Sequence, residues 1–194
     1  MAWNSPWALI YISDFVLTIT CARRYRRNLA GKIVFEGSLE LNPVFEREVN
    51  SEKYFSPRFL LLLVLTSTLI PIYWVLNVPN YPGLYTFVLG ALLSSELAIH
   101  VRHLGNLYLF SSTLTSDHLS GRIEYARPLI LRMSSVQILG FAILFAVNFV
   151  FTGSWFTAGG MVSCSALSAK HWYLARRAAA KRAKTAEASQ LTAG

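Results

Sequence analysis

The sequence predicts an all-α integral membrane protein, a bundle of five transmembrane helices with its N-terminus outside and its C-terminus in the cytoplasm. Of its 194 residues, 54% are hydrophobic and 14% are charged, and the mean hydropathy is +0.41; this is too apolar for an ordinary soluble domain. The apolar residues form blocks of about 20, enough to cross a hydrocarbon layer of about 30 Å as a helix. All 18 Lys and Arg residues lie between or at the ends of these blocks, all on one side of the predicted membrane.

The first predicted span covers residues 3–21 and contains Asp14. No charged residue precedes it, and four arginines follow it: Arg23, Arg24, Arg26 and Arg27. A cleaved signal peptide has the opposite order of charge, so we expect this segment to remain as a span. A cytoplasmic loop over residues 22–58 then carries the chain to the second span.

The next three spans are predicted over residues 59–78, 82–101 and 128–150. Each has a proline at or near its start (Pro57, Pro82 and Pro128), where the missing amide hydrogen costs a helix nothing. The fifth span, residues 155–171, is the least hydrophobic and is rich in small residues that allow helix backbones to approach closely in lipid. We therefore expect it to pack inside the bundle.

The distribution of cations predicts the orientation and the two parts of the chain. Lys and Arg occur in the first inner loop, in residues 102–132 and in residues 170–184, and none occurs in the two connections on the other side. This places a five-span membrane domain at residues 1–175 and a basic cytoplasmic tail at residues 176–194. We expect the tail to meet anionic lipid and the protein to lie in the cell membrane, which is the cytoplasmic membrane if the chain is prokaryotic.

Expected partners follow from the same pattern. We expect the chain to lie in a lipid bilayer. The pattern is compatible with a homo-oligomer or with a subunit of a larger membrane complex. The net charge of +8 does not indicate nucleic acid, because the cations flank apolar blocks instead of forming one basic stripe.

Ionisable residues inside spans indicate a candidate site. An acid near the bilayer centre costs about 2.5 to 3.5 kcal/mol, so Asp14 and Glu96 require a partner or a watery cavity. At 100° per residue, Glu96, His100 and His103 fall in a stripe about 60° wide on one face of the third span. We expect Asp14 to meet this stripe in an inner-side pocket, with Arg132 of the fourth span balancing the charge.

The first inner loop adds the run Glu40-Leu41-Asn42-Pro43. An aspartate on the first span followed by an E-L-N-P loop resembles small prokaryotic multi-spanning membrane proteins of unknown function, over about the first quarter of the chain. The resemblance implies no activity, and the arginines between the two elements depart from its pattern. Glu40 and Asn42 are secondary candidates for the site, as is His171 at the inner end of the fifth span.

Three functions remain open for these residues. In the first, the pocket binds a cation or proton, in transport or within a larger membrane complex. In the second, the polar residues only orient helices, and the chain is a non-catalytic accessory or assembly subunit. In the third, His100, His103 and Glu96 bind a divalent metal in an enzyme acting on a lipid-like substrate; a haem held by histidines is a further variant.

The sequence leaves open whether the chain is an enzyme, and it identifies no catalytic residue. It contains no G-x-S-x-G motif and no glycine-rich phosphate loop. The glutamate precedes both histidines of the stripe, unlike the arrangement in H-E-x-x-H metalloproteases.

Overall fold

A computed structural model describes residues 4–37, 45–112 and 121–191. This part of the chain is mostly helical, with six helices and two short strands. In chain order the elements are α1 (Asn4–Asn28), β1 (Ile33–Phe35), α2 (Glu46–Asn50), α3 (Pro57–Asn77), α4 (Pro82–Ser112), β2 (Ile123–Tyr125), α5 (Arg127–Thr152) and α6 (Trp155–Leu191).

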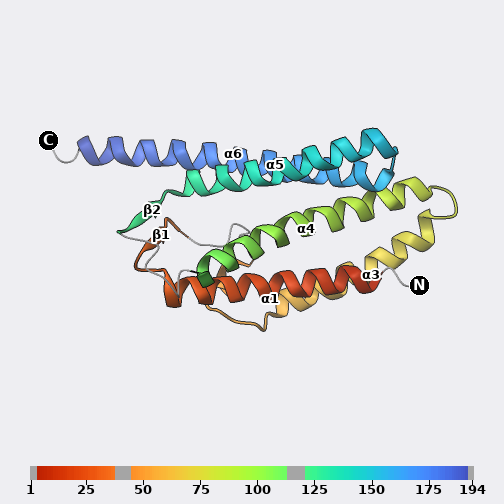
Figure 1. Cartoon of the computed structure of the whole chain (residues 1–194), viewed down its shortest axis with the longest axis horizontal. Coiled ribbons are helices and arrows are strands. Elements are labelled where there is room, and N and C mark those ends of the chain that lie inside the picture. Colours follow the sequence, from red (N-terminus) through yellow and green to blue (C-terminus); the bar gives the residue numbers. More distant parts are fainter. Residues whose placement is uncertain (1–3, 38–44, 113–120, 192–194) are drawn as a thin grey trace.

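The five long helices run roughly along one axis of the molecule (Figure 1). Helices α5 and α6 lie together on one side, α1 and α3 lie on the other, and α4 runs between them. Helix α6 packs along both α4 and α5, whereas α3 makes few contacts with the rest of the bundle. Most large side chains of α3 are therefore exposed, which suits a helix in contact with lipid.

Three of the described helices are long and apolar enough to cross a membrane: α3, α4 over residues 82–111, and α5. The bounds of α3 and α5 differ by only one or two residues from the spans predicted over 59–78 and 128–150. Helices α4 and α6 extend far beyond the predicted inner ends at 101 and 171. A helix satisfies its backbone hydrogen bonds internally, so it need not end where the apolar residues end.

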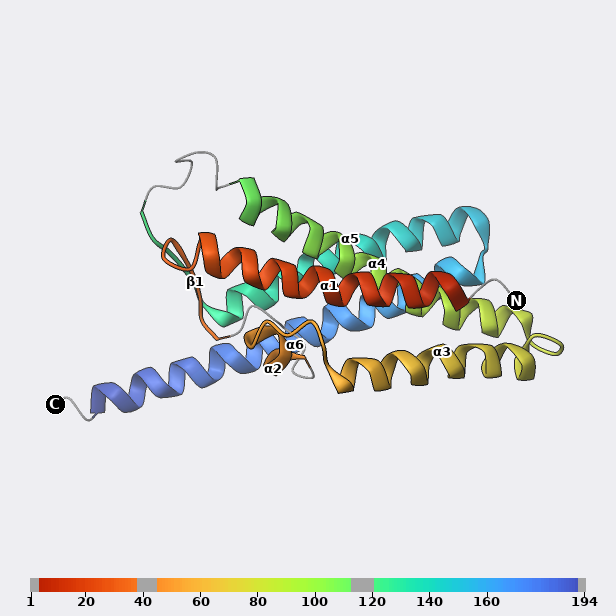
Figure 2. The same ribbon diagram turned by 90° about the horizontal axis from the view of Figure 1, so that it is seen from below.

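The two ends of the bundle differ. The start of α1, the α3–α4 turn and the α5–α6 turn lie at one end, and the end of α1, both strands and the extension of α6 lie at the other (Figures 1 and 2). The segments that carry the lysines and arginines are directed toward this second end, which we call the basic end.

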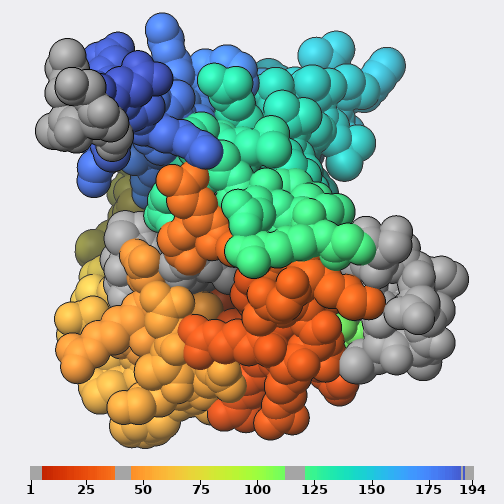
Figure 3. All heavy atoms as spheres, turned by 90° about the vertical axis from the view of Figure 1, so that its left-hand side faces the viewer, coloured from red at the N-terminus to blue at the C-terminus, as the bar shows by residue number. Residues whose placement is uncertain are grey.

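At the basic end, β1 and β2 form a two-stranded parallel sheet in which Ile33 pairs with Ile123, a departure from the all-α prediction. The two segments meet on the face shown in Figure 3, in orange and green. Glu36, just after β1, accepts a 3.0 Å hydrogen bond from the backbone nitrogen of Arg127 and forms a 3.3 Å ion pair with Arg182. The sheet and Glu36 thus join the first inner loop to α5 and α6.

Helices α4 and α6 touch through their backbones. A Cβ atom added to Gly159 would collide with the Phe87 carbonyl oxygen, and one added to Gly90 would collide with the Phe156 carbonyl oxygen. The predicted fifth span corresponds to α6, and the prediction that its small residues allow close helix packing is confirmed by these contacts and by the burial of Cys164. Its expected place inside the bundle is not confirmed: α6 lies on one side with α5, and α4 runs between the two sides (Figure 1).

Candidate functional site

A cavity of about 230 Å³ lies between α1, α3, α4 and α6, near the middle of α1 and α4 and beside the start of α3. Its polar lining consists of Tyr11, Asp14, Thr18, Glu96, Arg102, His103, Lys170 and His171. Its apolar lining consists of Phe15, Phe45, Phe59, Leu62, Ile99 and Leu167. The cavity therefore combines two carboxylates, two cations, two imidazoles and an aromatic wall.

Helix α1 contributes Tyr11, Asp14 and Thr18 to the cavity. At 100° per residue these positions fall within about 60° of one another, so they share one face of the helix. Asp14 also faces α4, where its Oδ1 lies 3.8 Å from Nδ1 of His100. Both side chains are mostly buried, at 18% and 21% exposure, so this ion-pair contact is partly shielded from water.

The residues of the predicted stripe on α4 lie in two different surroundings. Glu96 and His103 line the cavity, and His103 is only 7% exposed. His100 is directed to Asp14 and is not part of the cavity lining. Asp14, Glu96 and His103 therefore share one cavity, and His100 adjoins it through Asp14.

Arg132 does not lie at this cavity, contrary to the charge balance that we expected. It is exposed on α5, with its guanidinium carbon 5.8 Å from the centre of the Trp172 ring. Leu131, Ser134 and Ser135 occupy the buried face of α5, and Arg132 falls outside that face because successive helical residues turn by about 100°. The cations at the cavity are instead Arg102 and Lys170.

Arg102 begins a buried hydrogen-bond chain across three helices. Its Nη1 donates to Ser134 Oγ on α5 at 2.5 Å, and Ser134 Oγ lies 2.9 Å from Nδ1 of His171 on α6. The Ser134 hydroxyl accepts from Arg102 and can either donate to His171 Nδ1 or accept from it, according to the tautomer of the imidazole. This chain fixes the orientation of His171, a secondary candidate, at the cavity wall.

The metal-site hypothesis finds no support in the described residues, which contain no group of three or more His, Cys, Asp or Glu side chains placed to hold a metal ion. Glu96, His100 and His103 do not converge, because His100 turns toward α1. Glu40 and Asn42, the other two secondary candidates, lie outside the described residues.

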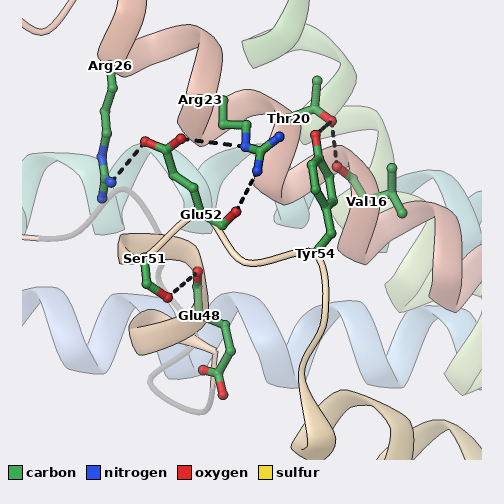
Figure 4. Close-up of polar contacts among 8 residues, drawn as sticks. All are labelled: Val16, Thr20, Arg23, Arg26, Glu48, Ser51, Glu52 and Tyr54. Atoms are coloured by element: carbon green, nitrogen blue, oxygen red, sulfur yellow. Dashed lines mark hydrogen bonds and ion pairs between the residues drawn. The ribbon is translucent and has the colours of Figure 1, made fainter.

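The chain between α2 and α3 is fastened to α1 near the cavity (Figure 4). The Glu52 carboxylate pairs with Arg23 at 3.5 Å and with Arg26 at 3.0 Å, and Arg23 also donates a 2.9 Å hydrogen bond to the Glu52 carbonyl. Glu52 has a φ of 54°, a conformation that most residues avoid. Together with α2, this segment links Phe45 to Phe59, whose rings both line the cavity. Its contacts with α1 therefore help to hold this part of the cavity wall in place.

Among the polar residues of the cavity and the network, Tyr11, Thr18, Arg102 and Ser134 were not singled out from the sequence as site residues. The spacing of Tyr11 and Thr18 around Asp14 was a usable signal, since all three fall on one helical face. Arg102 follows the third span directly and resembles the other inner-side cations. No local pattern distinguishes Ser134 from other serines, because its role depends on the approach of α4 and α6.

Comparison with known proteins gives no match to the chain among family models, curated proteins or solved structures. The cavity and its polar residues are therefore the basis for assigning a function.

Proposed function

We propose that the chain is a five-span membrane protein, N-terminus outside and C-terminus in the cytoplasm, whose cavity binds a cation or proton. Three helices are suited to crossing a membrane. Helices α1 and α6 run alongside α4, so a bilayer that surrounds α4 also surrounds them. The lysines and arginines gather toward one end of the bundle, which supports placing that end in the cytoplasm.

Asp14 and Glu96 carry the functional part of the proposal. An acidic residue within a span costs free energy, and such residues are typically found where they bind or transfer an ion or a proton. Both line a cavity of about 230 Å³, which has room for several waters. Among the described residues, the Glu96 carboxylate has no hydrogen-bond or ion-pair partner, so it is available to a ligand.

The cations that line the cavity, Arg102 and Lys170, are followed along α4 and α6 by the basic end, so we place the ligand's access on the cytoplasmic side. In the opposite half, the described parts of the helices offer only uncharged hydroxyl and amide groups such as Thr86 and Asn148. The protein therefore binds its cation or proton on one side, either as the inner half of a transport route or as a subunit of a larger membrane complex.

The orientation is tested by labelling introduced cysteines in intact cells with a membrane-impermeant maleimide. The two native cysteines, Cys21 and Cys164, are buried and are first replaced by alanine. Asn80→Cys, in the α3–α4 turn, should react without permeabilisation, and Lys184→Cys, on α6, only after it. Reaction of Lys184→Cys in intact cells would refute the cytoplasmic placement of the C-terminus.

Ion binding is tested with purified protein in weakly buffered neutral detergent, by following proton release on addition of potassium or sodium chloride. A cation that binds among these carboxylates and imidazoles should displace protons, and Glu96→Gln and His100→Ala should reduce the release. Glu187→Gln, on the exposed extension of α6, is the matched control and should behave like the wild type. Unchanged release in both the Glu96→Gln and His100→Ala variants, with folding intact, would favour the accessory-subunit hypothesis.

A further inference from the structure

A wide surface hollow of about 700 Å³ lies where the chain passes from α2 to α3, beside Arg23 of α1. Three further cations line it: Arg47 on α2, Lys53 in the connection, and Arg58 in the first turn of α3. All three are exposed. Within the described ranges, none of their side chains has a hydrogen-bond or ion-pair partner.

The two acids of the same lining do not compete for these cations. Glu52 is paired with Arg23 and Arg26 of α1. Glu48 accepts a 3.3 Å hydrogen bond from Ser56 through Oε1, and its Oε2 is buried. The charge that the hollow presents to a ligand is therefore positive.

The backbone around the hollow is held in place from both sides. The Glu52 contacts fasten the connection to α1 (Figure 4). At the other side, the Ser56 hydroxyl caps α3 by accepting a 3.2 Å hydrogen bond from the Phe59 backbone nitrogen. A ligand that binds here does not have to order this backbone first, which favours binding.

The hollow also lies at the level where the apolar surface of α3 begins. Leu61 and Val64, near the start of α3, are 67% and 62% exposed, and Phe55, just before the helix, is 70% exposed. An exposed aromatic ring next to the first apolar turns is typical of a membrane interface. If the basic end is cytoplasmic, the three cations lie among the headgroups of the inner leaflet, which contains anionic lipid.

We propose, building on the orientation in the proposed function, that this hollow binds the headgroup of an anionic phospholipid of the inner leaflet. Arg47, Lys53 and Arg58 bind its phosphate oxygens through charge-assisted hydrogen bonds, and its acyl chains lie along the exposed apolar face of α3. A zwitterionic headgroup binds less well because its ammonium meets the same cations. A soluble phosphate binds less well because it gains nothing from the apolar face.

The test is native mass spectrometry of the full chain in neutral detergent, titrated with phosphatidylglycerol or with phosphatidylcholine of the same acyl chains. The first phosphatidylglycerol should bind at least about tenfold more tightly than phosphatidylcholine. Arg58→Gln should weaken phosphatidylglycerol binding about fivefold, and the triple variant with Arg47→Gln, Lys53→Gln and Arg58→Gln should remove the preference. Glycerol 3-phosphate, added as a competitor, should displace the lipid only weakly.

A matched triple variant separates this site from general attraction to a basic protein. Arg24→Gln, Arg27→Gln and Lys184→Gln remove the same charge from exposed positions toward the basic end that do not line the hollow. This variant should keep the affinity for phosphatidylglycerol to within about twofold, since distant exposed charges are screened. Equal losses in the two triple variants would overturn the site, and displacement by glycerol 3-phosphate as strong as that by phosphatidylglycerol would mean that a soluble anion is bound instead.

Circular dichroism and size-exclusion chromatography establish which variants are folded. If the triple variant of the hollow does not fold, the single variants Arg47→Gln, Lys53→Gln and Arg58→Gln are each compared with Arg27→Gln, and equal affinities would again overturn the site.

This inference and the proposed function fail in different ways. Equal binding of the two lipids by the wild type, with cation-dependent proton release intact, would overturn the headgroup site and leave the cation site standing. A preference for phosphatidylglycerol without any response to cations would do the reverse. Reaction of Lys184→Cys with maleimide in intact cells would overturn the orientation, and the inner-leaflet lipid with it.

Discussion

The contact between α4 and α6 makes Gly159→Ala a sharp test of how the bundle packs. The added methyl carbon would overlap the Phe87 carbonyl oxygen and lie 2.8 Å from the Ala91 nitrogen. Both obstacles are backbone atoms of α4, so no side-chain rotation relieves the overlap. Helices α4 and α6 would have to move apart.

The size of the effect follows from two opposing terms. Ordinary contacts with carbon are about 3.5 to 4.0 Å long, so the Ala91 contact alone calls for a displacement of about 1 Å. Overpacking of this kind costs about 1 to 3 kcal/mol, while replacing a helical glycine with alanine returns about 0.5 to 1 kcal/mol. The two terms leave a net loss of about 0 to 2.5 kcal/mol. Because the Phe87 contact is shorter than the Ala91 contact, we expect the upper part of that range, about 1 to 2.5 kcal/mol, which corresponds to about 2 to 10 °C in Tm for a chain of this length.

The measurement is thermal unfolding in detergent, followed by circular dichroism at 222 nm. Gly140→Ala is the matched control, because Gly140 is also a helical glycine but a Cβ added there meets nothing within 4 Å. It should be neutral or slightly stabilising. If Gly159→Ala melts at the same temperature as Gly140→Ala, the close approach of α4 and α6 is wrong.

Two further substitutions test the polar contacts. Ser134→Ala should lower the free energy of unfolding by about 1 to 3 kcal/mol, because it removes the shared partner of Arg102 and His171. The control Ser165→Ala, at an exposed position of α6, should change it by less than about 0.5 kcal/mol. Equal effects of the two substitutions in chemical unfolding would refute the hydrogen-bond network. Glu52→Gln should lower Tm in dilute salt by the equivalent of at most about 1 kcal/mol, because its ion pairs with Arg23 and Arg26 are partly exposed, and the difference should shrink at high salt. The control Glu124→Gln breaks an ion pair whose two side chains are more than 60% exposed, and it should leave Tm unchanged at either salt concentration. If Glu52→Gln lowers Tm equally in dilute and in concentrated salt, the loss of its ion pairs is not the cause of the decrease.

Much of the site was accessible from the sequence, since Asp14 and Glu96 are ionisable residues in apolar blocks and Glu96 and His103 share a helical face. Their common cavity is a property of the assembled bundle. Which arginine lines the cavity could not be predicted in the same way. Arg102 and Arg132 are both arginines near the predicted inner ends of spans, and only the rotation of α4 and α5 about their axes directs one to the cavity and the other to Trp172.

The sequence by itself determined the apolar character of the chain, the long helices and the segregation of cations, because hydropathy and charge are properties of each segment that do not depend on its neighbours. Tertiary structure alone decided the pairing of β1 with β2, the contact of Asp14 with His100, and the aromatic wall opposite Arg102 and Lys170. These features join segments that are far apart in the chain, and they depend on how closely and at what rotation the helices pack. No single segment encodes that rotation.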